Sequence, residues 1–278
     1  GRSRAAEARA DADERSGTSG PESDKAGERL AKRIARAGLC SRREAEAWIR
    51  DGRVKVEGKL VTSPALDVTP DQTVLVDGKP LPEAAPARLF RYHKPRGVLT
   101  TARDEADRPT IYATLPPELP RLMPVGRLDL ASEGLLLLTN DGELKRKLEL
   151  PATGWLRRYK VRAYGVVTDE QLARLAKGVT VEGVAYGPIE ARLERQQGDN
   201  VWLTMGLREG KNREVRRVLE HLGLKVNRLI RLAYGPFQLG SLPKRGIEEV
   251  PRKVLRDQLG AAAGPPAPRH PARSSGRG

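Results

Sequence analysis

The sequence is poor in the residues that build metal centres and disulfide frameworks. It contains one cysteine, Cys40, and three histidines that lie far apart, His93, His221 and His270. A single cysteine excludes an intramolecular disulfide and leaves no cysteine-based zinc spacing, so we expect no metal site. The low cysteine content suits a reducing compartment, and we expect a cytoplasmic protein.

Long apolar runs and phosphate-binding loops are also absent. No stretch approaches the roughly 18 apolar residues of a membrane span. The N-terminal stretch GRSRAAEARADADERSG lacks the apolar centre of a signal peptide. No glycine-rich fingerprint for nucleotides occurs. Aromatic residues make up 4% and hydrophobic residues 38% of the chain, which predicts a core of modest size and no contact with a membrane.

Positive charge is what the chain has in excess. Lysine and arginine number 51 against 36 acidic residues, a formal net charge of +15. A surplus of this size attracts polyanions, of which nucleic acid is the commonest. A basic protein without a nucleic-acid partner remains the alternative on charge alone.

Composition divides the 278 residues into five segments. Residues 1–25 and 257–278 are rich in small, charged or proline residues, and we expect disordered tails, the second of them basic. Residues 26–80 form a compact unit of two helices followed by a small sheet, and residues 81–88 form a linker. Residues 89–256 mix strands and helices, so the expected fold class is α+β.

In the compact unit, Leu30, Ile34 and Leu39 mark a first helix that stops near Gly38. The capping box at residues 41–44 starts a second helix. Short strands are expected at residues 54–56, 60–61 and 73–76.

In the second domain, strands are expected at residues 89–92, 135–139, 159–163 and 201–207, with a turn at 140–142. A capping box at Thr168–Gln171 opens a helix that ends at Gly178, and Asn212 is expected to cap a helix over residues 213–222.

One carboxylate lies in an apolar setting. In VGRLDLASEGLLLLTNDGEL, Asp129 stands between two leucines and precedes a run that must be buried. In the helix NREVRRVLEHLG, Val215 and its apolar neighbours share one face, and Arg216 lies at its flank. A flanking guanidinium can reach a cleft and hold Asp129 ionised as a nucleophile or base. The alternatives are a loop aspartate bonded to backbone amides, a solvated arginine face, or a carboxylate pair with Glu133 as the second acid.

Two groups of cations suggest contact with nucleic acid. Tyr159 lies on a strand among Arg157, Arg158, Lys160 and Arg162, a pattern that suits base stacking and phosphate contact, although a core tyrosine on a charged strand gives the same pattern. The expected helices of the first unit carry further cations, which fit phosphates, a helix-turn-helix DNA reader or a solvated face. These cations are Arg29, Lys32, Arg33, Arg36, Arg42 and Arg43.

Four motifs in order resemble the RsuA/RluB group of RNA pseudouridine synthases. Gly126-Arg127-Leu128-Asp129 with SEGLLLLTNDGEL resembles the group's signature, and HKPRG at 93–97 resembles its Lys-Pro-x-Gly turn. Arg158-Tyr159-Lys160-Val161 resembles its tyrosine strand, and EGKNREVRR at 209–217 its last motif. Residues 27–80 resemble the small RNA-binding domain named after small-subunit ribosomal protein four. His93 departs from the asparagine frequent in related synthases, so we assign it no catalytic role.

The resemblance implies that the second domain is a mainly antiparallel sheet that converts a uridine of RNA to pseudouridine. Asp129 would be the nucleophile, Tyr159 would stack on a flipped-out base, and Arg216 would pair with Asp129. No cofactor is needed for an isomerisation, the partner would be rRNA or a ribosomal assembly intermediate, and we expect a monomer. RPTIYATLP and RLIRLAYGPFQLG favour the large-subunit branch; a small-subunit enzyme, a non-catalytic assembly factor and a DNA regulator are the alternatives. The residues expected to bind RNA are Arg127, Lys94, Arg213, Arg217, Arg29, Lys32, Arg33, Ser41, Arg42 and Arg43.

Overall fold

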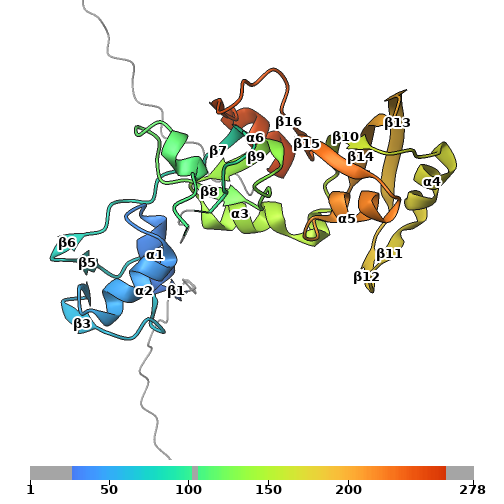
Figure 1. Ribbon diagram of the computed structural model, residues 1–278. Helices are drawn as coiled ribbons and strands as arrows, with labels where there is room; N and C mark the ends of the chain where they lie inside the picture. The colour runs from blue at the N-terminus through green and yellow to red at the C-terminus, as the bar shows by residue number, and fades with distance from the viewer. Residues whose placement is uncertain (1–26, 102–105, 261–278) are drawn as a thin grey trace, which may run out of the picture. The chain divides into compact units, whose positions relative to one another are not determined.

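The computed structural model describes residues 27–101 and 106–260 (Figure 1). The chain forms two compact units, one from residues 27–33 and 42–81 and one from residues 34–41 and 82–260. The tail predicted for residues 1–25 lies outside the described residues. Residues 261–278 of the second predicted tail lie outside them as well. Residues 257–259 belong to a helix, so the second domain extends beyond its predicted end at 256.

Residues 27–81 contain two helices and two small antiparallel sheets. In chain order these are β1 (Glu28–Arg29), α1 (Leu30–Arg36), α2 (Arg42–Arg50), β2 (Val54–Val56), β3 (Lys59–Val61), β4 (Asp67–Val68), β5 (Val74–Val76) and β6 (Lys79–Pro80). One sheet has the order β3-β2-β5-β6, and β1 pairs with β4. Helix α1 ends before Gly38, which has a φ of +85°, so Leu39 lies outside it and is 47% exposed. The prediction that Leu39 marks the helix was therefore wrong.

The second unit is built on a nine-stranded sheet. Its main order is β13-β14-β10-β15-β9-β7-β17, with β16 added beside β15 and β8 beside β9. All its pairs are antiparallel except β15 with β9, which confirms the mainly antiparallel α+β fold. The strands are β7 (Leu89–Lys94), β8 (Met123–Val125), β9 (Glu133–Thr139), β10 (Arg157–Tyr164), β13 (Ile189–Gln197), β14 (Asn200–Leu207), β15 (Lys225–Tyr234), β16 (Phe237–Gln238) and β17 (Ile247–Glu249).

Four helices, three single 3₁₀ turns and one hairpin complete this unit. The helices are α3 (Gly142–Glu149), α4 (Asp169–Arg174), α5 (Glu214–His221) and α6 (Arg252–Leu259). The 3₁₀ turns are η1 (Ile111–Thr114), η2 (Pro151–Thr153) and η3 (Leu175–Lys177), and the hairpin joins β11 (Val179–Val181) to β12 (Val184–Tyr186). The expected capping box at Thr168 and Gln171 is present at the start of α4.

Strand β9 is buried on both faces, which explains its unbroken leucines. Leu135 and Leu137 pack in a cluster with residues of α3 and α6, whereas Leu136 and Leu138 pack in another with Phe90. Since neighbouring side chains of a strand point to opposite faces, a strand between two cores reads as a continuous apolar run. The buried strand predicted from these leucines is confirmed, and the loop before it is thereby fixed to the centre of the sheet.

Two helix starts differ from their predictions. The segment predicted as a turn at 140–142 begins α3, because the Asp141 carboxylate accepts a hydrogen bond from the Leu144 backbone at 2.7 Å. At α5 the residue in the N-cap position is Arg213, with a φ of +50°, and Asn212 does not cap the helix. No side chain caps the amides of the first turn, and the Glu214 carboxylate accepts from the backbone amide of Lys211, which precedes the helix, at 3.0 Å.

Candidate active site

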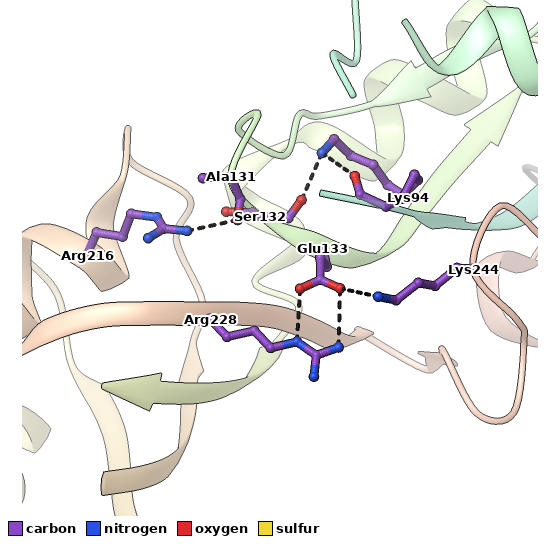
Figure 2. A network of polar contacts seen from close by, with 8 residues as sticks. Lys94, Ala131, Ser132, Glu133, Arg216, Arg228 and Lys244 are labelled. Atoms are coloured by element: carbon purple, nitrogen blue, oxygen red, sulfur yellow. Dashed lines mark hydrogen bonds and ion pairs between the residues drawn. The ribbon is translucent and has the colours of Figure 1, made fainter. Parts of the chain in front are cut away.

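The loop that carries Asp129 is held from below by one buried lysine. Lys94 ends β7 and is completely buried; its Nζ donates to the backbone oxygens of Ser132 at 2.8 Å, Pro95 at 3.0 Å and Asp129 at 3.1 Å. Figure 2 shows this ammonium beside the start of β9. All three of its hydrogen atoms are used, so the prediction that Lys94 contacts RNA was wrong; it supports the loop.

Burial makes this ammonium easier to deprotonate. It lowers the pKa of Lys94 to about 8, although the negative charges of Asp129 and Glu133 act in the opposite direction. A second bond, from the Gly97 amide to the Leu130 oxygen at 2.7 Å, ties the Lys-Pro-x-Gly turn to the same loop. The turn and the loop therefore form one structural support for Asp129.

The Asp129 carboxylate meets two guanidinium groups. Its Oδ2 lies 3.5 Å from Nε of Arg216 and 3.4 Å from Nη1 of Arg213. Arg216 is 7% exposed and also donates from Nη2 to the Ala131 oxygen at 3.1 Å, a contact visible in Figure 2. The pairing of Asp129 with Arg216 thus agrees with the position of Arg216 at the flank of the helix. The second contact, from Arg213, depends on the left-handed conformation of that residue, which sequence reasoning did not anticipate.

Burial lowers the pKa of the Arg216 guanidinium, while the charge of Asp129 raises it. An arginine keeps its proton in proteins, so Arg216 stays a cation beside Asp129. Arg216 and Arg213 together hold the Asp129 carboxylate at its place, and a carboxylate is a group that can act as a nucleophile or a base.

Asp129 opens onto a pocket of about 650 Å³ that is formed entirely by the second unit. Tyr159 on β10 lines the same pocket and is 8% exposed. Across the strand pair it faces Arg231 of β15, so these two side chains share one face of the sheet. The structure therefore brings Asp129, Tyr159 and Arg213 to one cavity, together with Arg127, which is exposed at its edge.

Three glutamates also line this cavity. Glu149 accepts from the Gly126 amide at 2.7 Å and pairs with Lys145, and Glu209 accepts from the Gly187 amide at 2.6 Å and pairs with Lys211 at 3.1 Å. Glu214 is 3% exposed; burial raises its pKa to about 7, and the neighbouring Glu209 adds to the rise. Glu149 and Glu209 are thus each paired with a lysine, whereas Glu214 accepts from the Lys211 amide with Oε2 and its Oε1 has no partner among the described residues.

Glu133 is not a second catalytic acid. It is 3% exposed, and its carboxylate is bonded to Nε of Arg228 at 3.0 Å and to Lys244 at 3.2 Å, as Figure 2 shows. Burial alone would raise the pKa of Glu133, but the bonds from Arg228 and Lys244 outweigh it and lower the pKa. The carboxylate is occupied in joining β9 to β15, which excludes the paired-carboxylate reading.

The cations expected to bind RNA in the first unit have different fates. Arg33 donates to the backbone oxygens of Thr69, Pro70 and Gln72, and Arg29 bonds to the Ala65 oxygen and Asp67, so both support the fold. Arg42 and Arg43 are exposed, and Arg42 lies 3.6 Å from Glu46. Lys32 and, in the second unit, Ser41 and Arg217 are half-buried. The surface for RNA is thus best sought at Arg42 and Arg43.

Residues 27–101 and 106–260 contain no group of three or more His, Cys, Asp or Glu side chains placed to hold a metal ion. Nor does any helix in that part of the chain have both the length and the apolar character to cross a membrane.

Comparison with known proteins agrees with the motifs and the geometry. Residues 88–221 match the family described as RNA pseudouridylate synthase, and residues 28–74 match the S4 domain. A protein of Rickettsia bellii described as an uncharacterized RNA pseudouridine synthase is 48% identical over 229 residues, which cover 82% of this chain and 99% of the relative. Ribosomal large subunit pseudouridine synthase B of Haemophilus influenzae is 42% identical over 85% of this chain and 69% of that protein.

A solved structure described as a pseudouridylate synthase is also similar. It is 28% identical, has a TM-score of 0.58, and the match covers 83% of this chain and 99% of the other. With its Asp129 loop, its tyrosine strand and an S4 domain ahead of the catalytic domain, the chain belongs to the family of RNA pseudouridine synthases.

Proposed function

We propose that this enzyme converts one uridine of large-subunit rRNA to pseudouridine, with Asp129 as the nucleophile. The observation that carries the proposal is the Asp129 carboxylate, placed at the pocket by a buried support and held by Arg216 and Arg213 at 3.5 and 3.4 Å. The reaction moves the bond of ribose C1′ from N1 to C5 of the same uracil. C5 loses a proton and N1 gains one, so the isomerisation balances without an external donor.

Each side chain of the pocket has a role in this proposal. Asp129 is the nucleophile that detaches the uracil from the ribose and is released when C5 bonds to C1′, and Arg216 and Arg213 hold its carboxylate in position. Tyr159 stacks on the freed base and is our candidate for assisting the removal of the C5 proton. A volume of about 650 Å³ accommodates a nucleotide that has left its stack. Leaving the stack costs a few kcal/mol, which contacts between cations and phosphates offset.

Large-subunit rRNA is favoured as the substrate by the relatives named above, because the H. influenzae protein carries that name. The motifs RPTIYATLP and RLIRLAYGPFQLG point to the same branch. Small-subunit rRNA is the second candidate. A non-catalytic assembly factor is disfavoured by the Asp129 pair, since a binding module has no use for a carboxylate that two arginines hold at a cavity.

The test is a map of pseudouridine across both rRNAs of cells that lack the protein, complemented with wild type, Asp129→Asn or Asp257→Asn. Asp257 is an exposed aspartate of α6 and serves as the matched control. We expect one large-subunit site to be lost and to return with wild type and Asp257→Asn only. Restoration by Asp129→Asn would refute the catalytic assignment, and a lost small-subunit site would correct the substrate.

A further inference from the structure

One wall of the pocket carries three arginines that the proposed chemistry does not use. They are Arg157 at the start of β10, Arg208 just after β14, and Arg231 of β15, and all three line the cavity. We call them, with Tyr234, the arginine corner. Asp129 is already paired with Arg213 and Arg216, so the positive charge of this corner is additional to the charge that Asp129 requires.

Arg231 is a buried cation without a counterion. It is 3% exposed, and its Nε donates to the Leu135 oxygen at 2.8 Å. Nη2 is buried without a hydrogen-bond partner in the part of the chain that the structure describes, and no carboxylate there forms an ion pair with Arg231. Burying a charge without a partner is expensive, so a folded protein retains such a group where a ligand supplies the missing partner.

Tyr234 holds two of these guanidinium groups in place. Its ring centroid lies 4.8 Å from the guanidinium carbon of Arg157 and 5.2 Å from that of Arg231. The ring itself is fixed, because its hydroxyl donates to the Leu148 oxygen at 2.9 Å and accepts from Arg157 at 3.2 Å. The two cations are therefore preorganised, which lowers the entropy cost of binding a ligand.

The hydrogen bonds of Arg157 and Arg208 leave their charges uncompensated. Arg157 donates from Nη1 to the Arg208 oxygen at 2.7 Å, and Arg208 donates from Nη1 to the Gly154 oxygen at 2.8 Å. Among the residues that the structure describes, neither forms an ion pair with a carboxylate, whereas Arg228 of the same unit is paired with Glu133. The glutamates of the pocket wall have other partners, as described above. A group of unpaired arginines next to a cavity matches a phosphate, which accepts several charge-assisted hydrogen bonds at once.

We propose that the arginine corner binds a backbone phosphate of the RNA, next to the nucleotide that enters the pocket. This inference rests on the proposed function, since that phosphate belongs to the strand that carries the target uridine. Tyr159 and Arg231 are register partners, so a phosphate at Arg231 lies next to the base-stacking position. The corner therefore positions the flipped nucleotide through its backbone and leaves recognition of the base to other groups.

The first experiment measures KM and kcat on a 23S rRNA transcript for Arg208→Gln, Arg157→Gln and Arg231→Gln. Arg256→Gln, an exposed cation of α6, controls for the loss of one charge. We expect KM to rise roughly tenfold or more for each corner variant with kcat changed by less than about threefold. The slope of log affinity against log salt should fall by about 1, and Arg231→Lys should recover part of the affinity. A KM like that of Arg256→Gln in all three variants would overturn the proposal.

The second experiment identifies the ligand atom. A synthetic RNA carries a neutral methylphosphonate at each linkage around the mapped uridine in turn. One such linkage should raise KM for the wild type and have no further effect in Arg208→Gln. An equal effect of that linkage in both proteins would show that the corner contacts a base or sugar and would overturn the proposal. A third result would also overturn the proposal: inorganic phosphate raises the Tm of wild type but not of Arg231→Gln, and no methylphosphonate linkage changes KM. The corner would then bind the free ion and not the RNA backbone.

These outcomes are separate from a failure of the proposed function. If wild type forms no pseudouridine in either rRNA, the function fails before any variant is compared. If wild type is active and the corner variants keep the wild-type KM, the phosphate site alone fails.

Discussion

Lys94 decides the geometry of a carboxylate that its side chain does not touch. Lys94→Met leaves the buried carbonyl oxygens of Pro95 and Ser132 without a donor, each worth about 1–3 kcal/mol. The Asp129 oxygen loses one of its two donors and keeps the Ser132 amide at 3.0 Å. The change also removes a buried charge. Burial lowers the pKa of Lys94 from 10.5 to about 8, so the free-energy cost of burying this charge, which the variant recovers, is about 3 kcal/mol. The lost partners and the recovered burial cost are of similar size, so we expect the free energy of unfolding in urea to change by less than about 3 kcal/mol. We expect kcat to fall by roughly 100-fold, because the loop that carries Asp129 shifts.

The matched control for this prediction is Lys253→Met, which removes an exposed lysine of α6. It should leave both the unfolding free energy and kcat near the wild-type values. If Lys94→Met folds with full activity, the three bonds do not position Asp129, and the loop must be held by its other contacts.

Glu214 gives the stability of the protein a pH dependence of known sign. Its pKa is about 7 in the folded chain and 4.5 without the fold, so the native state binds this proton more tightly. Its contribution is fully present below pH 4.5 and is lost as the pH rises through 7. Glu214→Gln mimics the protonated acid, so the variant should match wild type near pH 4.5 and be more stable by about 1–3 kcal/mol at pH 8.

Urea unfolding at both pH values tests this prediction, with Glu220→Gln as the control for an exposed glutamate of the same helix. Equal stability of wild type and Glu214→Gln at pH 8 would mean that Glu214 is already ionised at little cost.

At the scale of single residues, the sequence predicts the pair of Arg216 and Asp129 but not the other side chains that line the pocket. Helix periodicity places Arg216 at the flank of an apolar face, and the resemblance to pseudouridine synthases implies Asp129 as its partner. The place of Arg231 depends on the register of β15 against β10 and β9, which no local pattern contains. The sequence places Lys94 among the RNA-binding residues for a similar reason. Its burial depends on the long-range pairing of β7 with β9, which no local pattern shows.

Among the elements, the parallel junction of β9 and β15 is the most sensitive to side-chain size. Gly134 has a φ of +106°, and a Cβ there would lie 2.3 Å from the Arg231 oxygen and 2.7 Å from its amide nitrogen. A Cβ cannot approach backbone atoms this closely, so Gly134→Ala must push β15 from β9 or unfold both. We expect a loss of more than about 3 kcal/mol in unfolding free energy, measured by thermal and urea denaturation.

Gly142→Ala provides the matched control. Gly142 begins α3 and a Cβ there would meet nothing within 4 Å, so alanine should be neutral or stabilising by about 0.5–1 kcal/mol. A Gly134→Ala protein as stable as Gly142→Ala would show that the two strands can separate at little cost.

The elements differ in how well the sequence predicts them. The leucines of β9 and the alternation in β10 and β14 identify strands because burial alone sets their pattern. Helix α3 is missed because Asn140-Asp141-Gly142 is equally typical of a turn and of a helix start, and only the bond from the Leu144 amide decides. The N-terminus of α5 is misjudged because Arg213, in a left-handed conformation, takes the N-cap position that the sequence assigns to Asn212.

For the molecule as a whole, we expect the chemistry to lie in the second unit alone and RNA away from the pocket to be bound by the S4 domain. All residues that line the pocket come from the second unit, whereas the S4 domain matches residues 28–74 and exposes Arg42 and Arg43. A net charge of +15 supplies general attraction to RNA, which is distributed over both units and screened by salt. The chemistry depends on the fixed positions of the groups around Asp129, so the residues that carry it cannot be spread over both units.

This division predicts opposite effects of two variants. Arg42→Gln with Arg43→Gln should weaken rRNA binding by roughly tenfold and lower the salt slope by about 1–2, because two phosphate contacts are lost. The single-turnover rate at saturating RNA should stay near wild type, since no pocket residue changes. Asp129→Asn should do the reverse, with binding within about twofold of wild type and no detectable pseudouridine. Filter binding at several salt concentrations and a single-turnover assay measure both quantities, and a slower saturating rate in the double arginine variant would mean that the S4 domain takes part in placing the uridine.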